Sequence, residues 1–166
     1  MALTLTTIHI AIMFVAAAVF VVTAVSDIRT YRIPNVMCGL LFLLFPLFVA
    51  TSPHTINWVQ NTAVFTAVSL AGFALFLSKG IGAGDIKLLS VTSLWAGPDL
   101  IAVLLLVTTF IGGIESIIVG IALYLKRPKI SAPRNLLQGQ VPYGVAIATG
   151  GLVMLGKMAQ PFWLPG

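Results

Sequence analysis

The chain has 166 residues, of which 59% are hydrophobic and only 8% are charged, whereas soluble domains average about 25% charged residues. This composition predicts a membrane protein, and the chain is long enough for one bundle of helical spans without an added soluble domain. The net charge of +5 does not predict nucleic-acid binding. The basic residues lie between apolar runs, and no basic surface interleaved with aromatic residues is visible.

The chain contains six apolar runs, which polar segments separate. A membrane span needs about 20 apolar residues. The fourth run is short because Gly97-Pro98 ends it, so we expect a helix that its neighbours protect from lipid. The first run is expected to be a retained span rather than a signal peptide, because no basic residue precedes it. The sequence therefore predicts an all-α, polytopic membrane bundle in one domain, 1–166, with about six spans at 8–26, 33–50, 56–78, 86–95, 100–125 and 141–157.

The basic residues predict the orientation of this bundle. Eight of the nine lie in the loops after the first, third and fifth runs, and the loops after the second and fourth runs hold none. Because cytoplasmic loops carry an excess of Lys and Arg, these three loops are predicted to face the cytoplasm. Both termini are then predicted to lie on the outer side.

Two of the four acidic residues, Asp27 and Asp85, follow the first and the third apolar run. Two spans separate them, and an even number of crossings returns the chain to the same face, so both carboxyls are predicted at the cytoplasmic edge. Two carboxylates that share a site cannot both ionise readily, so one keeps a proton while the other acts as a base. The alternative is a pair of solvated boundary residues next to Arg29 or Lys87.

The residues around both aspartates resemble the prepilin peptidase family. These enzymes are membrane aspartyl proteases of the Gly-x-Gly-Asp type that remove the leader from type IV pilin precursors. The resemblance rests on three motifs in order, which are Asp27-x-Arg29-x-x-x-Ile33-Pro34-Asn35, Gly82-Ala83-Gly84-Asp85-x-Lys87 and Pro142-Tyr143-Gly144. It implies that Asp27 and Asp85 are catalytic. The residues expected to bind substrate or shape the site are Gly82, Gly84, Lys87, Arg29, Asn35, Pro142, Tyr143 and Gly144.

The chain departs from the larger members of this family. Those members carry a cytoplasmic insertion whose cysteine pairs bind zinc, and many also methylate the new pilin N-terminus. Here the first cytoplasmic loop is only a few residues long, and Cys38 is the one cysteine in the chain. Zinc binding and methylation are therefore not carried over, and we expect neither a metal nor a cofactor.

The short form is similar to the minimal peptidases of the Flp (tight adherence) pilus systems, with preflagellin peptidases as a nearby possibility. The resemblance implies that a prepilin or pseudopilin precursor is cleaved on the cytoplasmic side of the bacterial inner membrane. Membrane lipid is the other expected partner, and nucleic acid is not one.

Two other functions remain open at this point. A small proton-coupled transporter would use Asp27, Asp85 and Glu115 as a proton relay, and such a relay places acids along a path across the membrane. A non-catalytic assembly subunit would tolerate Asp-to-Asn changes. Glu115 lies in the fifth run between Gly112 and Gly120, a region of small residues typical of a helix-packing seam, so it is predicted to face the bundle interior.

The remaining expectations concern the surroundings of the aspartates. The glycine-rich stretch 80–84 is expected to be a hinge or a close-approach element, with valine poorly tolerated at Gly84 wherever φ is positive. Asn35 is expected to cap the second helix or to form a hydrogen bond near the site. Arg29 and Lys87 are expected to anchor the protein at the cytoplasmic face or to tune an aspartate by proximity.

Overall fold

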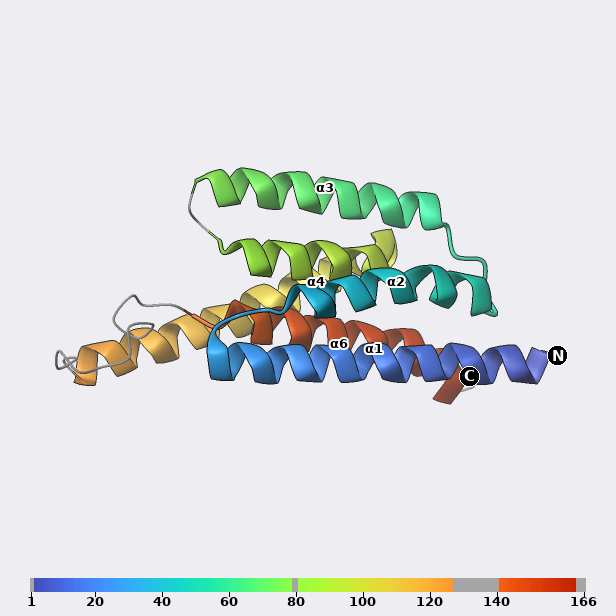
Figure 1. The fold of residues 1–166 in the computed structure, drawn as a ribbon, viewed down its shortest axis with the longest axis horizontal. Coiled ribbons are helices and arrows are strands. Elements are labelled where there is room, and N and C mark those ends of the chain that lie inside the picture. Colours follow the sequence, from blue (N-terminus) through green and yellow to red (C-terminus); the bar gives the residue numbers. More distant parts are fainter. Residues whose placement is uncertain (1, 79–80, 127–140, 164–166) are drawn as a thin grey trace.

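The computed structural model describes residues 2–78, 81–126 and 141–163, and these residues form only α-helices. The helices lie along one common axis, and Figure 1 shows that α1 begins and α6 ends at the same end of the bundle. The predicted all-α fold is confirmed for this part of the chain. The helices are α1 (Ala2–Thr30), α2 (Asn35–Thr51), α3 (Trp58–Leu77), α4 (Ala83–Lys126) and α6 (Tyr143–Trp163).

Three segments of the described helices are long and apolar enough to cross a membrane, and α2 is a shorter apolar helix. Large apolar side chains such as Phe14, Leu70 and Leu106 are exposed on their outer faces, as expected where hydrocarbon rather than water surrounds a helix. The chain is thus a helical membrane protein. The number of spans and the outer location of both termini stay predictions, and the basic residues of the predicted loop 127–140 lie outside the described residues.

Helix α4 consists of two arms that meet at Gly97, where φ is 56° and ψ is −168°. The chain reverses its direction at this residue, so that the second arm returns beside the first (Figure 1). The break predicted at Gly97-Pro98 therefore exists. The first arm corresponds to the short fourth run, and residues 90–97 are all buried, which confirms that neighbouring helices enclose this short segment.

Asn61 of α3 completes the end of the first arm. The carbonyl of Leu94 would normally accept a hydrogen bond from the residue four positions on, but that residue is Pro98, which has no N–H. The buried Asn61 instead donates its Nδ2–H to this carbonyl at 2.9 Å. A Cβ on Gly97 would lie 2.7 Å from Asn61 Oδ1, so glycine is needed there both for the positive φ and for this close approach.

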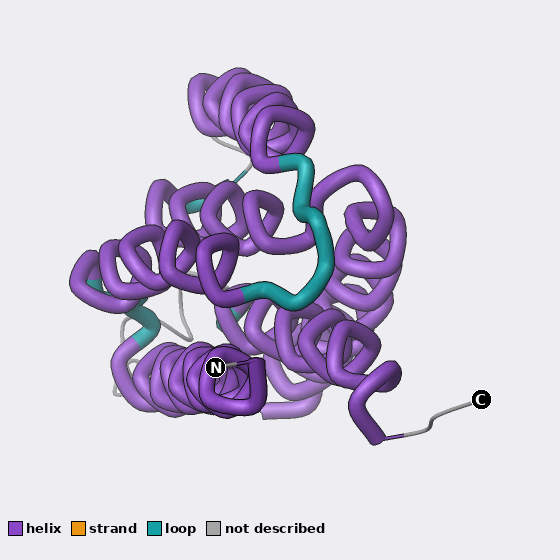
Figure 2. The backbone as a smooth tube through the Cα atoms, turned by 90° about the vertical axis from the view of Figure 1, so that its right-hand side faces the viewer, coloured by secondary structure: helices purple, strands orange, loops and turns teal. Residues whose placement is uncertain are grey.

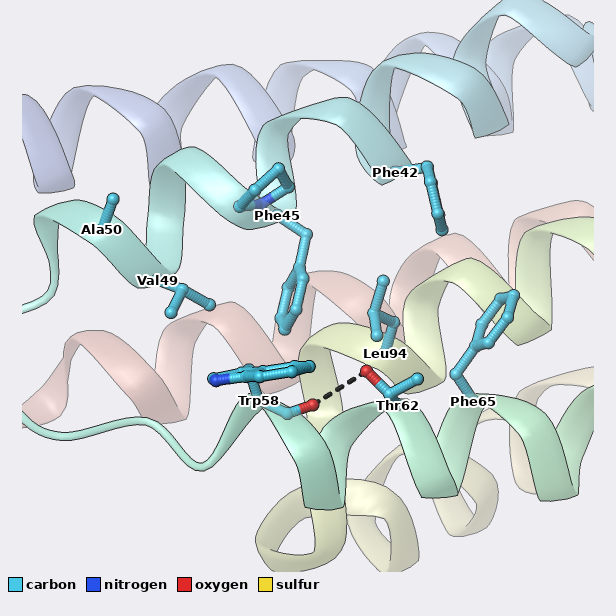
Figure 3. Close-up of a pocket in the computed structure, with 9 residues that line it drawn as sticks. Phe42, Phe45, Val49, Ala50, Trp58, Thr62, Phe65 and Leu94 are labelled. Atoms are coloured by element: carbon cyan, nitrogen blue, oxygen red, sulfur yellow. Dashed lines mark hydrogen bonds between the residues drawn. The ribbon is translucent and has the colours of Figure 1, made fainter.

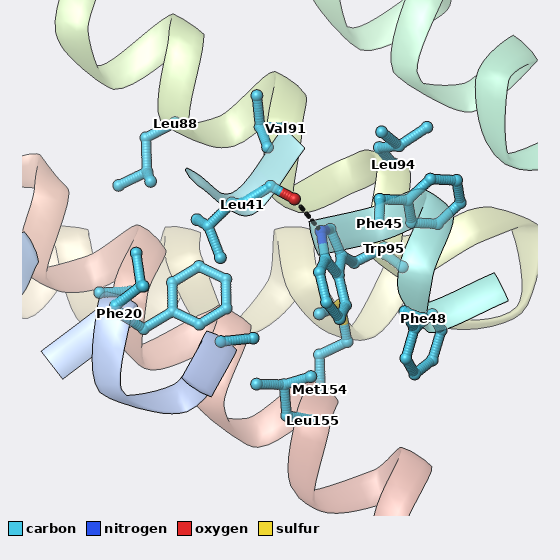
Figure 4. Packing of buried hydrophobic residues seen from close by; sticks show 14 of the residues in the cluster. Phe20, Leu41, Phe45, Phe48, Leu88, Val91, Leu94, Trp95, Met154 and Leu155 are labelled. Atoms are coloured by element: carbon cyan, nitrogen blue, oxygen red, sulfur yellow. Dashed lines mark hydrogen bonds between the residues drawn. The ribbon is translucent and has the colours of Figure 1, made fainter. Parts of the chain in front are cut away.

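The packing around Trp95 holds the first arm in place (Figure 4). Trp95 is completely buried, and its Nε1 donates a hydrogen bond to the carbonyl of Leu41 in α2 at 3.0 Å. Its ring lies against Phe45 and Phe48, with centroids 6.0 Å and 4.8 Å away. These contacts fix the arm, and with it the position of Asp85 at its start.

Helix α3 packs against α4, and the end-on view in Figure 2 shows α3 at the outer edge of the bundle. An apolar groove of about 420 Å³ separates it from α2 (Figure 3). Through Phe42 and Phe65 this groove continues into a second hollow, which Asn35 and Lys87 line. The groove residues are Phe42, Phe45, Pro46, Val49, Ala50, Trp58, Thr62, Phe65 and Leu94.

The role of Gly97 can be tested by Gly97→Ala. We expect this variant to lose at least about 1–2 kcal/mol of unfolding free energy, the cost of a left-handed backbone for a residue with a side chain. Gly120→Ala in the same helix is the matched control, because a Cβ there meets nothing within 4 Å. Thermal unfolding of both proteins in detergent measures the difference, and equal melting temperatures would contradict the assignment.

Candidate active site

Three of the four acidic residues gather at one end of the bundle, which we call the carboxylate end. It is the end at which α1 ends and both α4 and α6 begin (Figure 1). Asp27 lies in the last turn of α1, Asp85 in the first turn of α4, and Glu115 in the second arm of α4. The charge of Asp27 acts on both Asp85 and Glu115, so each of these two carboxyls lies within electrostatic range of Asp27.

Asp27 is the most enclosed of these acids, with only 4% of its surface exposed. The backbone amides of Gly144 and Val145, in the first turn of α6, face its carboxyl group. Amides at a helix N-terminus are suited to stabilising a negative charge. The Oδ2 atom is buried and has no hydrogen-bond partner among the described residues, so it is available to a water or a substrate group.

Helix α1 ends at Thr30, just after Asp27, and the chain turns at Tyr31. The amide of Tyr31 donates to the carbonyl of Asp27 at 2.8 Å, and Tyr31 adopts a left-handed φ of 52°. The side chain of Ser26 donates to the carbonyl of Arg32 at 3.1 Å, and Thr30 donates to the carbonyl of Ser26 at 2.8 Å. This conformation costs a non-glycine residue free energy, and it turns the chain back over the carboxylate end.

Gly144 allows α6 to approach Asp27. A Cβ at this position would lie 2.7 Å from Oδ2 of Asp27 and 2.9 Å from Cδ1 of Ile33. Pro142 lies just before α6 and accepts a hydrogen bond from the amide of Val145 at 3.1 Å. The Pro142-Tyr143-Gly144 motif therefore places the start of α6 directly against the Asp27 carboxyl.

Tyr143 attaches the start of α6 to the second arm of α4. Its ring covers Gly112, whose Cβ position is 2.8 Å from Cε1 of Tyr143. Its hydroxyl lies 3.3 Å from the Oγ of Ser116. The predicted packing seam is therefore present at Gly112 but does not extend to Gly120, where a Cβ would meet nothing within 4 Å.

Asp85 is the third residue of α4, and the residue just before that helix helps to hold its carboxyl. The amide of Gly82 faces the Asp85 carboxyl, while the carbonyl of Gly82 accepts the amide of Ile86 at 3.2 Å. The Asp85 carboxyl thus supplies one half of a helix capping box, while the carbonyl of Gly82 accepts the first helical hydrogen bond. A Cβ on Gly82 would lie 2.8 Å from Oδ2 of Asp85, so the absence of a side chain leaves room for the carboxyl.

The described part of the glycine-rich stretch shows close approach, one of the two roles expected for it. Neither Gly82 nor Gly84 has a positive φ, and Gly84 lies in the first turn of α4. The Cβ position of Gly84 is 3.4 Å from Cβ of Ile33, at the limit of ordinary contact. These two glycines therefore serve close approach rather than left-handed backbone, and Gly80 lies outside the described residues.

The other predicted residues form the rim of this end. Lys87 donates its Nζ–H to Oδ1 of Asn35 at 3.1 Å, which links the start of α4 to the start of α2. The expectation that Asn35 caps α2 is wrong, because the N-cap residue is Pro34 and no side chain caps the helix. Arg29 is exposed in the last turn of α1, where a cation complements the helix dipole.

Ile33 is a site residue that the sequence placed in a motif without a role. Its side chain lies against the Cβ positions of both Gly84 and Gly144, and thus joins the loop after α1 to the starts of α4 and α6. The sequence offered one signal for these contacts, which is a β-branched residue in one motif and a glycine in each of the other two. Among the described residues, no group of three His, Cys, Asp or Glu side chains could hold a metal ion.

A helical membrane protein with two neighbouring carboxyls at one end has groups that can hold and transfer a proton. The profile of the type IV leader peptidase family matches residues 14–117, which is more than half of the chain, and the chain belongs to this family. No curated protein and no solved structure matches the chain. The matched region contains Asp27, Asp85 and Glu115 but ends before the Pro142-Tyr143-Gly144 motif.

Gly144→Ala tests whether α6 must approach Asp27 so closely. We expect leader removal to fall at least ~10-fold, on the order of 1.4 kcal/mol of barrier, because the new methyl group displaces the Asp27 carboxyl. Gly156→Ala in the same helix is the control, since its Cβ would meet nothing within 4 Å. A gel-shift assay of precursor processing measures both variants, and equal activity would rule out this positioning role.

Gly82→Ala tests the corresponding contact at Asp85. The atom that a new Cβ would meet is the end of the flexible Asp85 side chain, so the carboxyl moves and the backbone does not. We therefore expect a melting temperature near that of the wild type together with a clear loss of processing. Gly39→Ala, which adds a Cβ into open space, serves as the control. Loss of activity only in proportion to loss of folded protein would refute this prediction.

Proposed function

We propose that the protein is an aspartic endopeptidase that removes the leader peptide of type IV prepilins, with Asp27 and Asp85 as the catalytic pair. The observation that carries this proposal is the location of both carboxyls at one end of the bundle, within electrostatic range of each other. Membership of the type IV leader peptidase family supplies the reaction. The two carboxyls supply the acid and the base that the reaction needs.

In the proposed mechanism the pair holds one proton between its two carboxyls, because neighbouring negative charges repel each other. The ionised carboxylate takes a proton from a water molecule, and the water oxygen attacks the carbonyl carbon of the scissile peptide bond. The protonated carboxyl donates a hydrogen bond to the carbonyl oxygen, and a proton then passes to the leaving amine. The enclosed position of Asp27 strengthens these electrostatic interactions by excluding water.

The proposal also covers the substrate and the orientation of the protein in the membrane. We propose that the substrate is an Flp-type prepilin or pseudopilin whose apolar helix lies in the membrane beside the bundle. The carboxylate end faces the cytoplasm in the bacterial inner membrane, and the distribution of basic residues supports this orientation. A basic leader is suited to the anionic lipid headgroups on that side.

The arrangement of acids favours the peptidase over the proton-coupled transporter. A relay needs acidic groups along a path across the membrane. Three of the four acids in the chain instead lie at the carboxylate end, and the fourth, Asp99, is exposed next to the reversal of α4. No acid in the described bundle bridges these two positions.

The catalytic pair can be tested by Asp27→Asn and Asp85→Asn. Each change preserves the size of the side chain but removes the ability to share a proton, so we expect leader removal to be abolished while the protein still inserts into the membrane. Asp99→Asn is the matched control and should process the precursor normally. Gel shift of the precursor gives the readout. Normal processing by either Asp27→Asn or Asp85→Asn would refute the proposed function.

A further inference from the structure

Glu115 is the acidic residue at the carboxylate end that the proposed mechanism does not use. Its Oε2 atom is buried and has no hydrogen-bond partner among the described residues. An acidic side chain within a membrane helix costs about 2.5–3.5 kcal/mol on insertion scales. An unpaired carboxyl at this position therefore indicates a functional residue.

The described surroundings of Glu115 contain no counter-ion for it. The charged group that acts on it is Asp27, which carries the same sign and is itself 4% exposed with an unpartnered Oδ2. The nearest polar groups in sequence are already engaged, because Ser116 donates to the carbonyl of Gly112 at 2.7 Å and contacts the hydroxyl of Tyr143. Within the described structure, the positive charge that would balance these two acids is therefore missing.

Among the described residues, no cation at this end pairs with Glu115 or Asp27. Lys87 donates to Asn35 on the rim, and Arg29 is exposed in the last turn of α1. A metal ion is not indicated, because the described acids do not form a group that could hold one. The chemistry that fits the unpartnered Oε2 of Glu115 in an apolar setting is then a cationic side chain, whose aliphatic stem also tolerates apolar walls.

We propose that Glu115 is a specificity-determining residue that binds the Lys or Arg side chain nearest to the scissile bond of the substrate. This inference rests on the proposed function, since it requires the substrate backbone to lie at Asp27 and Asp85. The bound cation neutralises Glu115 next to Asp27, and it fixes the position of the scissile bond along the catalytic pair. Glu115 thus acts on the choice of substrate and on its position, and it does not take part in the proton transfers.

The test compares two precursors that differ only in the basic residue nearest to the scissile bond, which is Lys in one and Gln in the other. We expect the wild-type protein, reconstituted in lipid vesicles, to prefer the Lys precursor by at least ~10-fold in kcat/KM, equivalent to about 1.4 kcal/mol. Glu115→Gln should reduce this preference to less than about 3-fold through a higher KM for the Lys precursor, which is less than about 0.7 kcal/mol. The variant should lose more kcat/KM on the Lys precursor than on the Gln precursor.

Glu115→Asp is the conservative variant, and it should retain a preference for the Lys precursor because it retains the charge. An unchanged preference in Glu115→Gln would overturn the inference and leave the proposed function intact. An equal loss on both precursors would show a structural role and would overturn it as well. If Glu115→Gln does not fold, the wild-type protein still tests the inference through its kcat/KM on the two precursors. Equal values for the Lys and the Gln precursor would refute the inference. Cleavage of neither precursor by the wild type would instead reject the proposed function.

Discussion

A carboxyl group with 4% exposure at the end of an apolar helix is costly, and the local architecture follows from accommodating Asp27. Two amides at the start of α6 face it, which requires α6 to begin at the same end as α1 finishes. Gly144 gives the space for this approach, and Ile33 fills the gap between the three segments. The enclosed first arm of α4, held through Trp95, then brings Asp85 to the same place.

The sequence predicted the features that membrane crossings and backbone chemistry constrain strongly. An even number of spans between Asp27 and Asp85 returns the chain to one side, so their common end could be deduced without side-chain detail. The reversal of α4 could also be located, because Pro98 leaves the carbonyl of Leu94 without its helical partner. The residue that replaces this partner, Asn61, lies in another helix, and no local pattern identified it.

The features that the sequence did not predict depend on close contacts between segments that lie far apart in the sequence. Gly82 and Gly84 belong to one motif, yet one adjoins the carboxyl of Asp85 and the other adjoins Ile33. A local pattern cannot distinguish a glycine needed for space from one needed for a positive φ. The closeness of Glu115 to Asp27 depends likewise on how far the second arm of α4 runs back after Gly97, which the apolar run alone does not reveal.

The contribution of α6 to the Asp27 environment has a consequence for the synthesis of the protein. A growing chain that has passed Asp85 contains both aspartates but lacks the amides of Gly144 and Val145. At about 5–20 residues per second, the ribosome needs roughly 3–12 s to reach those amides. During this interval the nascent protein cannot assemble its complete carboxylate end. Neighbouring polypeptides that enter the membrane at the same time therefore meet an unfinished site, and its completion coincides with the insertion of α6.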